Sequence, residues 1–233
     1  TCALPIWFAG GRRRQMFFAA LAGLGRDAPT VGGARCVDVG ASTGGFTQVL
    51  IRRGAASVAA IDVGHGQLAP VVADDPRVTD HSGTTVRGLD PSAVGGPFDV
   101  LVADLSFVSL RTVAEDLAGL VRAGGHAIVL VKPQFEVGRE RLGKNGLVRS
   151  ASARRHAVLE AAHALAAAGL QPRRALPSPV VGTTGNREYL LWLTRTADLD
   201  PDATGPAPTG ASSALTWQAL EMEIDRIVAT EEG

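Results

Sequence analysis

The feature that most constrains the fold of this chain is a loop of small residues between an apolar run and a helix-like run. Residues 36–37 are apolar and are followed by Asp38, and the loop 40–45 reads Gly-Ala-Ser-Thr-Gly-Gly before the helix-like segment 47–53. Glycine lets the backbone approach a ligand closely, and a helix N-terminus offers free N–H groups. The pattern therefore favours a strand–loop–helix unit that binds a ligand, although a tight glycine turn without a ligand would give the same letters.

The spacing of the glycines narrows the class of ligand. A nucleoside-triphosphate loop carries Lys after its last glycine, whereas Phe46 stands there in this chain. A dinucleotide loop reads G-x-G-x-x-G, whereas this loop reads G-x-x-x-G-G. The pattern instead resembles the S-adenosylmethionine loop of the doubly wound methyltransferases. We expect the cofactor to be bound by Asp38, Gly40, Ala41, Ser42, Thr43, Gly44, Gly45, Phe46 and Thr47.

A second acid supports a cofactor that contains a ribose. Residues 57–61 read Ser-Val-Ala-Ala-Ile, as a strand would, and Asp62 and Val63 follow them. In this class of fold an acid at the end of the second strand accepts hydrogen bonds from ribose hydroxyls. Aspartate before glycine is also common in turns, so the acid alone is not specific. Together, loop and acid predict a nucleoside cofactor that contacts Asp62 and Val63.

The composition bounds the possible partners of the chain. With 233 residues, of which 45% are hydrophobic, the chain can bury a full core. Its formal net charge is zero, so any contact with nucleic acid must come from a local patch. The two cysteines, Cys2 and Cys36, predict neither a disulfide framework nor a cysteine-rich metal site. No apolar run approaches the ~18 residues that span a bilayer. We therefore expect no metal, no membrane contact and a cytoplasmic location.

Strand-like and helix-like segments alternate along the chain. Candidate strands are residues 35–39, 57–61, 77–80, 98–103, 126–131, 173–180 and 188–194, and candidate helices lie near 44–53, 66–73, 109–122 and 152–168. Gly124, Gly125 and Gly169 stand where helix C-caps belong, and Ser152 is a candidate N-cap. The alternation predicts a Rossmann-like α/β fold with a mostly parallel, seven-stranded sheet whose last two strands form an antiparallel hairpin.

The predicted domain organisation has four parts. Residues 1–30 form an atypical N-terminal segment, and residues 31–196 form the α/β domain. Residues 197–213 are rich in Pro, Ala, Thr, Gly and Ser, which is typical of a flexible linker. Residues 214–233 contain an amphipathic helix, because their apolar residues recur at helical spacing. Such a helix usually packs on its own domain, and binding a partner is the alternative.

Three charged residues are expected at one edge of the sheet. Asp104 and Lys132 each follow an apolar strand, and Glu188 opens the last one. The carboxyl ends of parallel strands meet at one edge, and the start of an antiparallel last strand lies there too. Any one of these residues could merely end a strand. An acid, a lysine and a second acid suit methylation of a hydroxyl oxygen. The prolines typical of amino-group methyltransferases are missing after Asp104, and no cysteine is placed for methylation of a pyrimidine carbon.

At these residues the chain closely resembles the TlyA group of FtsJ-like ribosomal RNA 2′-O-methyltransferases, which are often labelled haemolysins. The resemblance covers about residues 35–194, and its most specific parts are Lys132–Glu136 (Lys-Pro-Gln-Phe-Glu) and Asn186–Glu188 (Asn-Arg-Glu). It implies S-adenosylmethionine as cofactor and ribosomal RNA as partner, with the ribose of a cytidine as target. It also implies that Asp104, Lys132 and Glu188 are catalytic, and that Asp104 additionally faces the cofactor.

The chain departs from the family at its N-terminus. By the resemblance, Arg14 falls where the first lysine of the family's Lys-Asp-Lys-Glu set is expected, and we expect the family's small N-terminal RNA-binding module to be absent. Residues 1–7 resemble nothing in the family, so we expect a truncated gene fragment with an artefactual start. Thr85 stands where the family usually has Asn. Arg14 could supply positive charge but cannot act as a base.

The resemblance leaves two roles open for Lys132, namely base and orienting partner of the hydroxyl, because the neighbouring acids favour its charged form. The loop that follows Lys132 combines positive charge with an aromatic ring, which suits phosphate contact and base stacking. The alternative is a solvated loop whose charge is balanced by Glu136 and Glu140. The predicted RNA-binding residues are Arg14, Phe135, Arg139, Arg141, Lys144 and Arg149.

Three other functions are weighed against the methyltransferase. A fragment that binds S-adenosylmethionine and RNA but no longer catalyses would follow from the missing module and the missing lysine. A NAD(P)-dependent oxidoreductase fits the fold but not the glycine spacing. A haemolysin that acts on membranes has weak support, since the C-terminal amphipathic helix carries Glu221, Glu223 and Asp225 and membrane-surface helices are usually basic.

Overall fold

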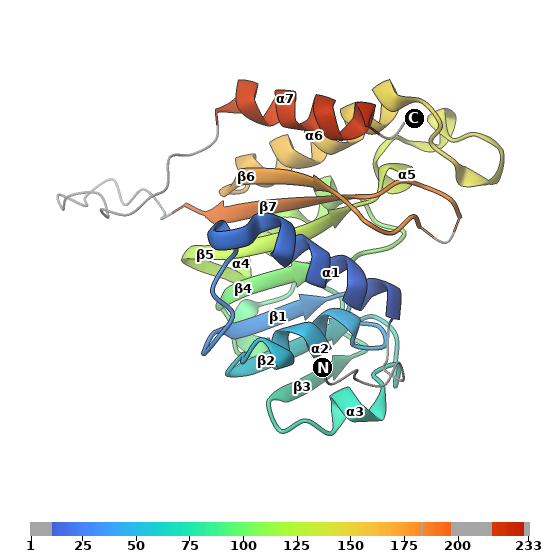
Figure 1. Cartoon of the computed structure of the whole chain (residues 1–233). Coiled ribbons are helices and arrows are strands. Elements are labelled where there is room, and N and C mark those ends of the chain that lie inside the picture. Colours follow the sequence, from blue (N-terminus) through green and yellow to red (C-terminus); the bar gives the residue numbers. More distant parts are fainter. Residues whose placement is uncertain (1–10, 183, 197–215, 231–233) are drawn as a thin grey trace, which may run out of the picture.

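The computed structural model describes residues 11–182, 184–196 and 216–230, and the strands of this part form one sheet (Figure 1). Each strand is built from an apolar run that the neighbouring layers bury. In chain order the strands are β1 (Arg35–Val39), β2 (Ser57–Asp62), β3 (Val78–Ser82), β4 (Phe98–Ala103), β5 (Val121–Val131), β6 (Leu170–Pro177) and β7 (Tyr189–Arg195).

The strand order in the sheet is β3-β2-β1-β4-β5-β7-β6. β1 pairs in parallel with both β2 and β4, and β5 continues the parallel arrangement. β7 is antiparallel to both of its neighbours, β5 and β6. The predicted seven-stranded, mostly parallel sheet with a C-terminal antiparallel hairpin is therefore confirmed. From β1 the chain first adds β2 and β3 on one side of the sheet and then crosses to β4 on the other side of β1. The carboxyl ends of β1 and β4 therefore frame a crevice.

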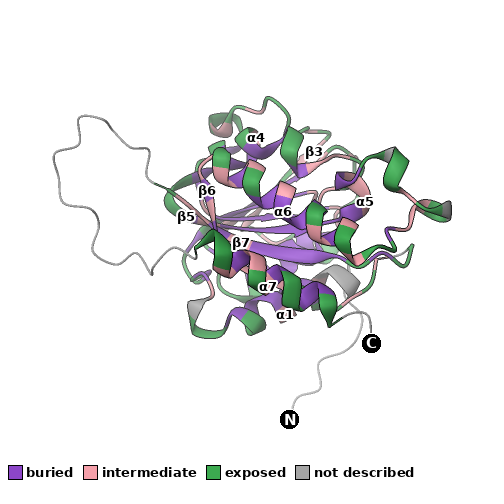
Figure 2. Ribbon diagram, turned by 90° about the horizontal axis from the view of Figure 1, so that it is seen from above, coloured by how far each residue is buried: buried purple, intermediate pink, exposed green. Residues whose placement is uncertain are grey.

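Helices cover both faces of this sheet. They are α1 (Gly11–Leu24), α2 (Gly45–Arg52), α3 (Pro70–Ala73), α4 (Ala114–Gly119), α5 (Pro133–Glu136), α6 (Ala151–Ala167) and α7 (Trp217–Ala229). Short turns of 3₁₀ type connect them, namely η1 (Gly25–Asp27), η2 (Pro91–Val94), η3 (Leu110–Thr112), η4 (Arg139–Arg141) and η5 (Lys144–Gly146). Figure 2 shows the strands buried between these helices.

One face of the sheet packs against α1 and α2. The rings of Phe17 and Phe46 stack there with their centroids 4.9 Å apart. Leu21 and Leu50 complete the contact between the two helices, and all four side chains are buried. Although residues 1–30 are expected to be an atypical segment, the described part of that segment therefore belongs to the core of the domain.

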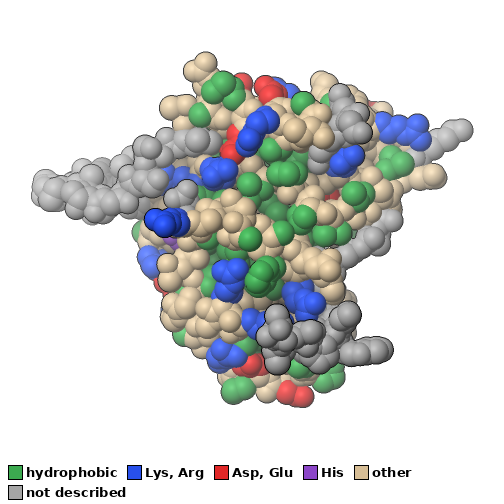
Figure 3. Space-filling view, in the orientation of Figure 1, with side chains coloured by type: hydrophobic (Ala, Val, Ile, Leu, Met, Phe, Trp, Pro, Cys, Tyr) green, Lys and Arg blue, Asp and Glu red, His purple; other side chains and the backbone are tan. Residues whose placement is uncertain are grey.

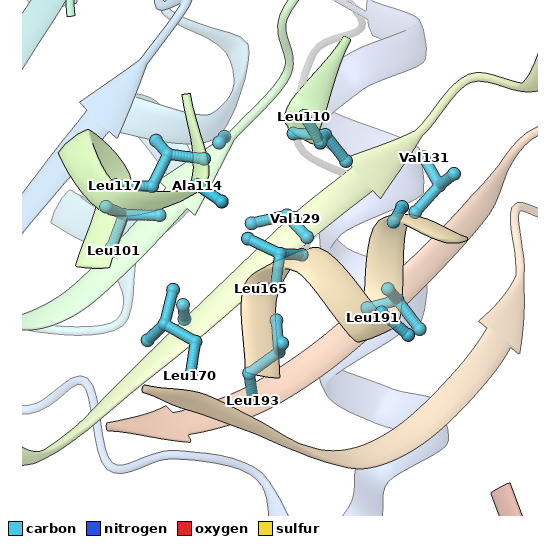
Figure 4. Close-up of a cluster of buried hydrophobic side chains, with 14 of the residues drawn as sticks. Leu101, Leu110, Ala114, Leu117, Val129, Val131, Leu165, Leu170, Leu191 and Leu193 are labelled. Carbon is cyan, nitrogen blue, oxygen red and sulfur yellow. The ribbon is translucent and has the colours of Figure 1, made fainter. Parts of the chain in front are cut away.

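The other face packs against α4, α6 and α7. Leu117 from α4 and Leu165 from α6 meet Val129 and Leu191 of the sheet in a cluster shown in Figure 4. The side chains of neighbouring strand residues alternate between the two faces, which is why Val37 joins this cluster while Cys36 joins the opposite one.

Helix α7 packs on its own domain, as the amphipathic pattern predicts. Its buried residues Leu220, Ile224, Ile227 and Val228 join the core cluster beneath α6, and α7 also lies along β6. The expected linker 197–213, like residues 1–10, lies outside the described residues.

Several predicted boundaries are wrong, for reasons of packing. The expected helix 109–122 divides into η3 and α4, and β5 begins at Val121 instead of 126. Gly124 and Gly125 lie inside β5, next to a shift in its register with β4, and do not cap a helix. The expected helix 66–73 shortens to α3.

The N-cap of α6 is Ser150 and not Ser152, because the Ser150 hydroxyl accepts the Ala153 N–H at 3.2 Å. The glycine at 169 does follow α6, with φ of 91°.

Candidate active site

The glycine loop is held by the acid that precedes it. Asp38 Oδ2 accepts hydrogen bonds from the Thr47 N–H at 2.8 Å and from the Thr47 hydroxyl at 2.6 Å. Asp38 and Thr47 are both buried, so this pair joins the end of β1 to the first turn of α2. A carboxylate at a helix N-terminus is stabilised by the helix dipole. Asp38 therefore fixes the shape of the loop from beneath.

Gly40 brings the loop against the end of the neighbouring strand. Its φ is 84°, and a Cβ at this position would lie 2.4 Å from the backbone oxygen of Asp104. Gly44 has φ of 86°, and its Cβ would lie 2.8 Å from Val72 Cγ1. Both positions require glycine, the first for the approach of two strand ends and the second for the packing of α3.

A pocket of about 540 Å³ opens at the carboxyl ends of β1, β2 and β4. This volume lies within the range of small-molecule sites. Its walls come from four segments: the glycine loop, the end of β2, the residues after β3 and the loop after β4. The lining residues include Gly40, Ser42, Asp62, Val63, Thr85, Asp104 and Phe107.

Asp62 stands in the pocket wall and also ties two loops together. Its Oδ2 accepts the Ser42 N–H at 2.8 Å, and its Oδ1 accepts the Gly64 N–H at 2.8 Å. An ionised carboxylate has about four lone-pair positions, so these two bonds leave room for hydroxyl donors. The position of Asp62 is compatible with the predicted ribose contact.

The predicted cofactor residues divide into two groups. Gly40, Ser42, Asp62, Val63 and Asp104 line the pocket. The pocket lining does not include Asp38, Ala41, Thr43, Gly44, Gly45, Phe46 or Thr47. Phe46 points its ring into the core against Phe17, so its side chain has a structural role. The buried residues of this second group shape the loop from which the first group projects.

Lys132 and Asp104 meet at the edge of the pocket. Lys132 Nζ lies 2.7 Å from Asp104 Oδ1 and donates a hydrogen bond to Ser106 Oγ at 2.8 Å. The two charged side chains are only 10% and 3% exposed, so the pair is largely screened from water. Nζ also lies 5.9 Å from the centroid of the Phe135 ring. The structure thus brings Asp104 and Lys132 together, as predicted, and Ser106 is an additional partner of the lysine.

Glu188 lies opposite Lys132, directly before β7. Val131 pairs with Tyr189 in the β5–β7 ladder, and Lys132 and Glu188 are the next residues beyond that pair. The Glu188 side chain is buried. Its carboxylate lies close to the backbone of Gly182, where a Cβ would be 2.8 Å from Oε1. The hairpin thus places Glu188 at the same sheet edge as Asp104 and Lys132.

The predicted RNA-binding residues lie on two segments. Arg14 is half-buried near the start of α1. Phe135, in α5, is half-buried, and its ring centroid lies 5.2 Å from that of Phe107. Arg141 and Arg149 are exposed, whereas Arg139 and Lys144 are placed only by their backbone, in η4 and η5.

Phe107 and Asn186 have positions at the site that the sequence alone did not predict. Phe107 is 91% exposed at the pocket edge and has φ of 64°, which is rare for a bulky residue. Asn186 is buried, and its amide accepts the Val148 N–H at 2.9 Å and donates to the Gly146 oxygen at 2.9 Å. Its membership of the specific Asn-Arg-Glu segment was a usable signal. Asn186 thereby connects residues 146–148 to the segment just before β7, which contains Glu188.

Within the described ranges, no helix combines the length and the apolar character that crossing a bilayer requires. Among the same residues, no three His, Cys, Asp or Glu side chains gather in the way that a metal ion would require.

Comparison with known proteins adds three relationships. Residues 24–195 match the model of the FtsJ-like methyltransferases. The 16S/23S rRNA (cytidine-2′-O)-methyltransferase TlyA of Mycobacterium tuberculosis is 47% identical over 175 residues, which cover 75% of this chain and 65% of that protein. A solved structure described as a hemolysin from Streptococcus thermophilus superposes with a TM-score of 0.81 at 30% identity, over 98% of this chain and 76% of that one.

A more distant structure shows the same fold alone. It is the magnesium protoporphyrin IX methyltransferase ChlM from Synechocystis with bound S-adenosylhomocysteine, which aligns with a TM-score of 0.55 at 16% identity, over 78% of this chain and 83% of that one. The alignment with the tuberculosis relative covers 65% of that protein, so the chain spans slightly less than two thirds of its length.

Proposed function

Because the chain belongs to the FtsJ-like methyltransferase family, we propose that it transfers a methyl group from S-adenosylmethionine to the 2′-oxygen of a ribose in ribosomal RNA. A cytidine is the proposed target, by analogy with the tuberculosis relative. The observation that carries the proposal is the buried Lys132–Asp104 pair beside a pocket of cofactor size. A ribosomal substrate would place the protein in the cytoplasm.

The residues of the pocket fit S-adenosylmethionine. Gly40 lets the loop lie directly against the Asp104 backbone in the pocket wall, and Asp62 offers carboxylate oxygens to ribose hydroxyls. Ser42 and Val63 flank that acid, and Thr85 lies farther along the wall. When bound, S-adenosylmethionine supplies the methyl group. The protein would contribute mainly by orientation, an effect worth up to ~7–11 kcal/mol in model reactions.

Lys132 is proposed to bind the 2′-hydroxyl. Asp104 and Ser106 fix its ammonium group, so it is aimed as a hydrogen-bond donor before any substrate arrives. Such a preset donor stabilises negative charge that develops on an oxygen. Glu188, at the adjacent position of the hairpin, would help to fix the lysine. Whether Lys132 also removes the proton is the question that its arginine variant addresses.

RNA is proposed to approach over the edge that carries the two phenylalanines. The rings of Phe107 and Phe135 lie beside the lysine and could stack on a base, as single-stranded RNA is often bound. Arg141 and Arg149 on the following loop are exposed and could contact phosphates. Arg14, on α1, would add positive charge where the family has lysine.

The test is transfer of labelled methyl from S-adenosylmethionine to unmodified ribosomal subunits, with 2′-O-methyl nucleosides measured in the digest. Lys132→Ala is expected to abolish transfer and to lower the affinity for the cofactor several-fold at most, since the lysine does not line the pocket but holds Ser106 in its wall. Lys132→Arg separates the two roles, because arginine keeps the charge but cannot lose a proton. Residual transfer by Lys132→Arg would assign orientation, and none would assign the base.

Arg226→Ala, on the exposed side of α7, is the control and should transfer methyl as the unaltered protein does. Full activity of Lys132→Ala would contradict the assignment. Label on a base and not on ribose would contradict the proposed reaction.

A second candidate is a protein that binds S-adenosylmethionine and RNA without catalysis. The observation in its favour is Arg14, which stands where the family places its first lysine. Cofactor binding with no transfer by the unaltered protein would favour this candidate. A thermal shift produced by NAD but not by S-adenosylmethionine would instead favour an oxidoreductase.

A further inference from the structure

Glu136 is a buried acid to which the proposed reaction gives no role. It is the last residue of α5, four positions after Lys132, and only 1% of its side chain is exposed. Burial of a carboxylate is costly unless its oxygens are hydrogen-bonded. The groups that bind Glu136 therefore indicate what the residue does.

The partners of Glu136 lie at the end of the loop that follows β4. Its Oε1 accepts the Leu110 N–H at 2.8 Å, and its Oε2 accepts the Ser109 hydroxyl at 2.5 Å. Arg111 Nε lies 3.7 Å from Oε2, and an Arg111 guanidinium N–H donates to the Glu136 backbone oxygen at 3.2 Å. One carboxylate thus fixes three consecutive residues at the start of η3.

The same loop is held at its other end by Lys132. There Nζ contacts Asp104 and donates to Ser106, as described above. The segment between the two attachments, residues 105–108, lines the pocket and contains Phe107 with its positive φ. A bulky residue keeps such a backbone conformation only where its surroundings enforce it. The two attachments, both from residues 132–136, provide that enforcement.

We infer that Glu136 is a positioning residue that holds loop 105–108 in the wall of the pocket, and that cofactor binding depends on it. This inference rests on the proposed function, because it takes the pocket to bind S-adenosylmethionine. Glu136 would act through Leu105, Ser106 and Phe107 and would itself touch neither cofactor nor RNA.

The protonation state of Glu136 gives the attachment a pH dependence. Burial raises the pKa of its carboxyl, while the bonds from Ser109 and Leu110 and the charge of Arg111 act in the opposite direction. The facing charges are Arg111 on η3 and, beyond it, Glu160 on α6 at 3.7 Å from Arg111. Protonation removes an acceptor position from Glu136. The bonds and the charge that hold the loop favour the carboxylate, so the attachment is complete above the pKa of Glu136 and weakens as the pH falls through it, and Glu136→Gln should lack this dependence.

The test measures amide hydrogen exchange of residues 105–110 together with the affinity for S-adenosylmethionine by calorimetry. Glu136→Ala should accelerate exchange in this segment about tenfold or more, because it removes the bonds to Ser109 and Leu110. It should also lower the affinity for S-adenosylmethionine several-fold. Glu136→Gln keeps an oxygen for the Leu110 N–H and should recover part of both effects. Glu160→Ala is the matched control, since Glu160 shares Arg111 but does not touch the loop.

Three results would overturn the inference. The first is unchanged exchange of residues 105–110 in Glu136→Ala. The second is an equal acceleration throughout β4 and β5, which would indicate a general loss of stability. The third is faster exchange of the loop with unaltered cofactor affinity. If the unaltered protein binds no S-adenosylmethionine, the proposed function fails, whereas the exchange data alone still decide whether Glu136 holds the loop.

Discussion

At the scale of single residues, three aspartates end parallel strands of the sheet but have different partners. Asp38 holds the first turn of α2, Asp62 joins two loops, and Asp104 binds Lys132. Their chemistry follows from these partners. Only Asp104, which lies beside Lys132 and lines the pocket, suits a reaction that must orient a hydroxyl group.

The closeness of β1 and β4 can be tested at Gly40. Gly40→Ala should cost about 1–3 kcal/mol for overlap with the Asp104 oxygen, beyond the strain of its positive φ. Gly33→Ala is the matched control, because Gly33 has φ of 75° and nothing within 4 Å of its Cβ position. Urea unfolding of both variants isolates the overlap. Equal losses of stability would show that the strand ends are not tightly packed.

Cys36 should be inert in the folded protein. Burial, and to a lesser degree the charge of Asp99, raise the pKa of its thiol to about 12. At pH 8 the nucleophilic thiolate is therefore almost absent. A Cys2→Ser variant should not react with a thiol reagent at pH 8 until a denaturant is added. Rapid reaction of this variant in native buffer would mean that the strand is accessible.

At the scale of secondary structure elements, α7 protects the edge of the sheet. β6 is the last strand in the sheet order, and an unpaired strand edge can pair with another chain. Glu223 of α7 accepts the Ala175 N–H at 2.9 Å and the Arg174 Nε–H at 2.7 Å. The helix thereby binds a backbone group of the edge strand as well as covering apolar surface.

Removal of this contact should be measurable. Glu223→Ala should destabilise the protein by about 1–3 kcal/mol, because it leaves a backbone N–H without its acceptor. Asp225→Ala is the control on the same helix, because its pair with Arg155 is more exposed and should contribute about 0–1 kcal/mol. Thermal or urea unfolding compares the two, and similar losses would argue against a special role for the β6 contact.

At the scale of the whole molecule, charge does not favour RNA globally. The formal net charge is zero, and on the face seen in Figure 3 the Lys and Arg side chains are spread over several places. In the proposed function, affinity for RNA would therefore come from a few local residues. The bonds of Asn186 and Arg154 to the backbone of residues 146–149 hold in place the loop that carries Arg141 and Arg149.

Salt dependence of RNA binding tests this local interaction. An Arg141→Ala/Arg149→Ala variant should reduce the slope of log K against log salt by about 0.7–0.9 for each phosphate that is no longer neutralised. An Arg26→Ala/Arg226→Ala variant changes the net charge equally, on η1 and α7, and should leave the slope unaltered. A similar decrease in both variants would indicate a diffuse attraction without a defined site.

The sheet, the glycine loop and the ends of the key strands could be predicted from the sequence alone. The apolar runs, the alternation of strand-like and helix-like segments and the glycine spacing are local signals, and they sufficed to predict Asp104, Lys132 and Glu188 at one edge. The TlyA-like segments added the expected chemistry. The same local signals were misleading at Gly124 and Gly125, which were predicted to end a helix but lie inside β5.

Which residues line the pocket and which support it depends on how the folded chain packs. Phe46 packs in the core against Phe17, and the helix expected over 109–122 divides into η3 and α4, at whose start Glu136 accepts the Leu110 N–H. The roles of Glu136 and Asn186 depend on partners 26 and 38 residues away in the chain. Contacts at such separation leave no periodic pattern in the sequence, because they are fixed by the packing of whole elements against one another.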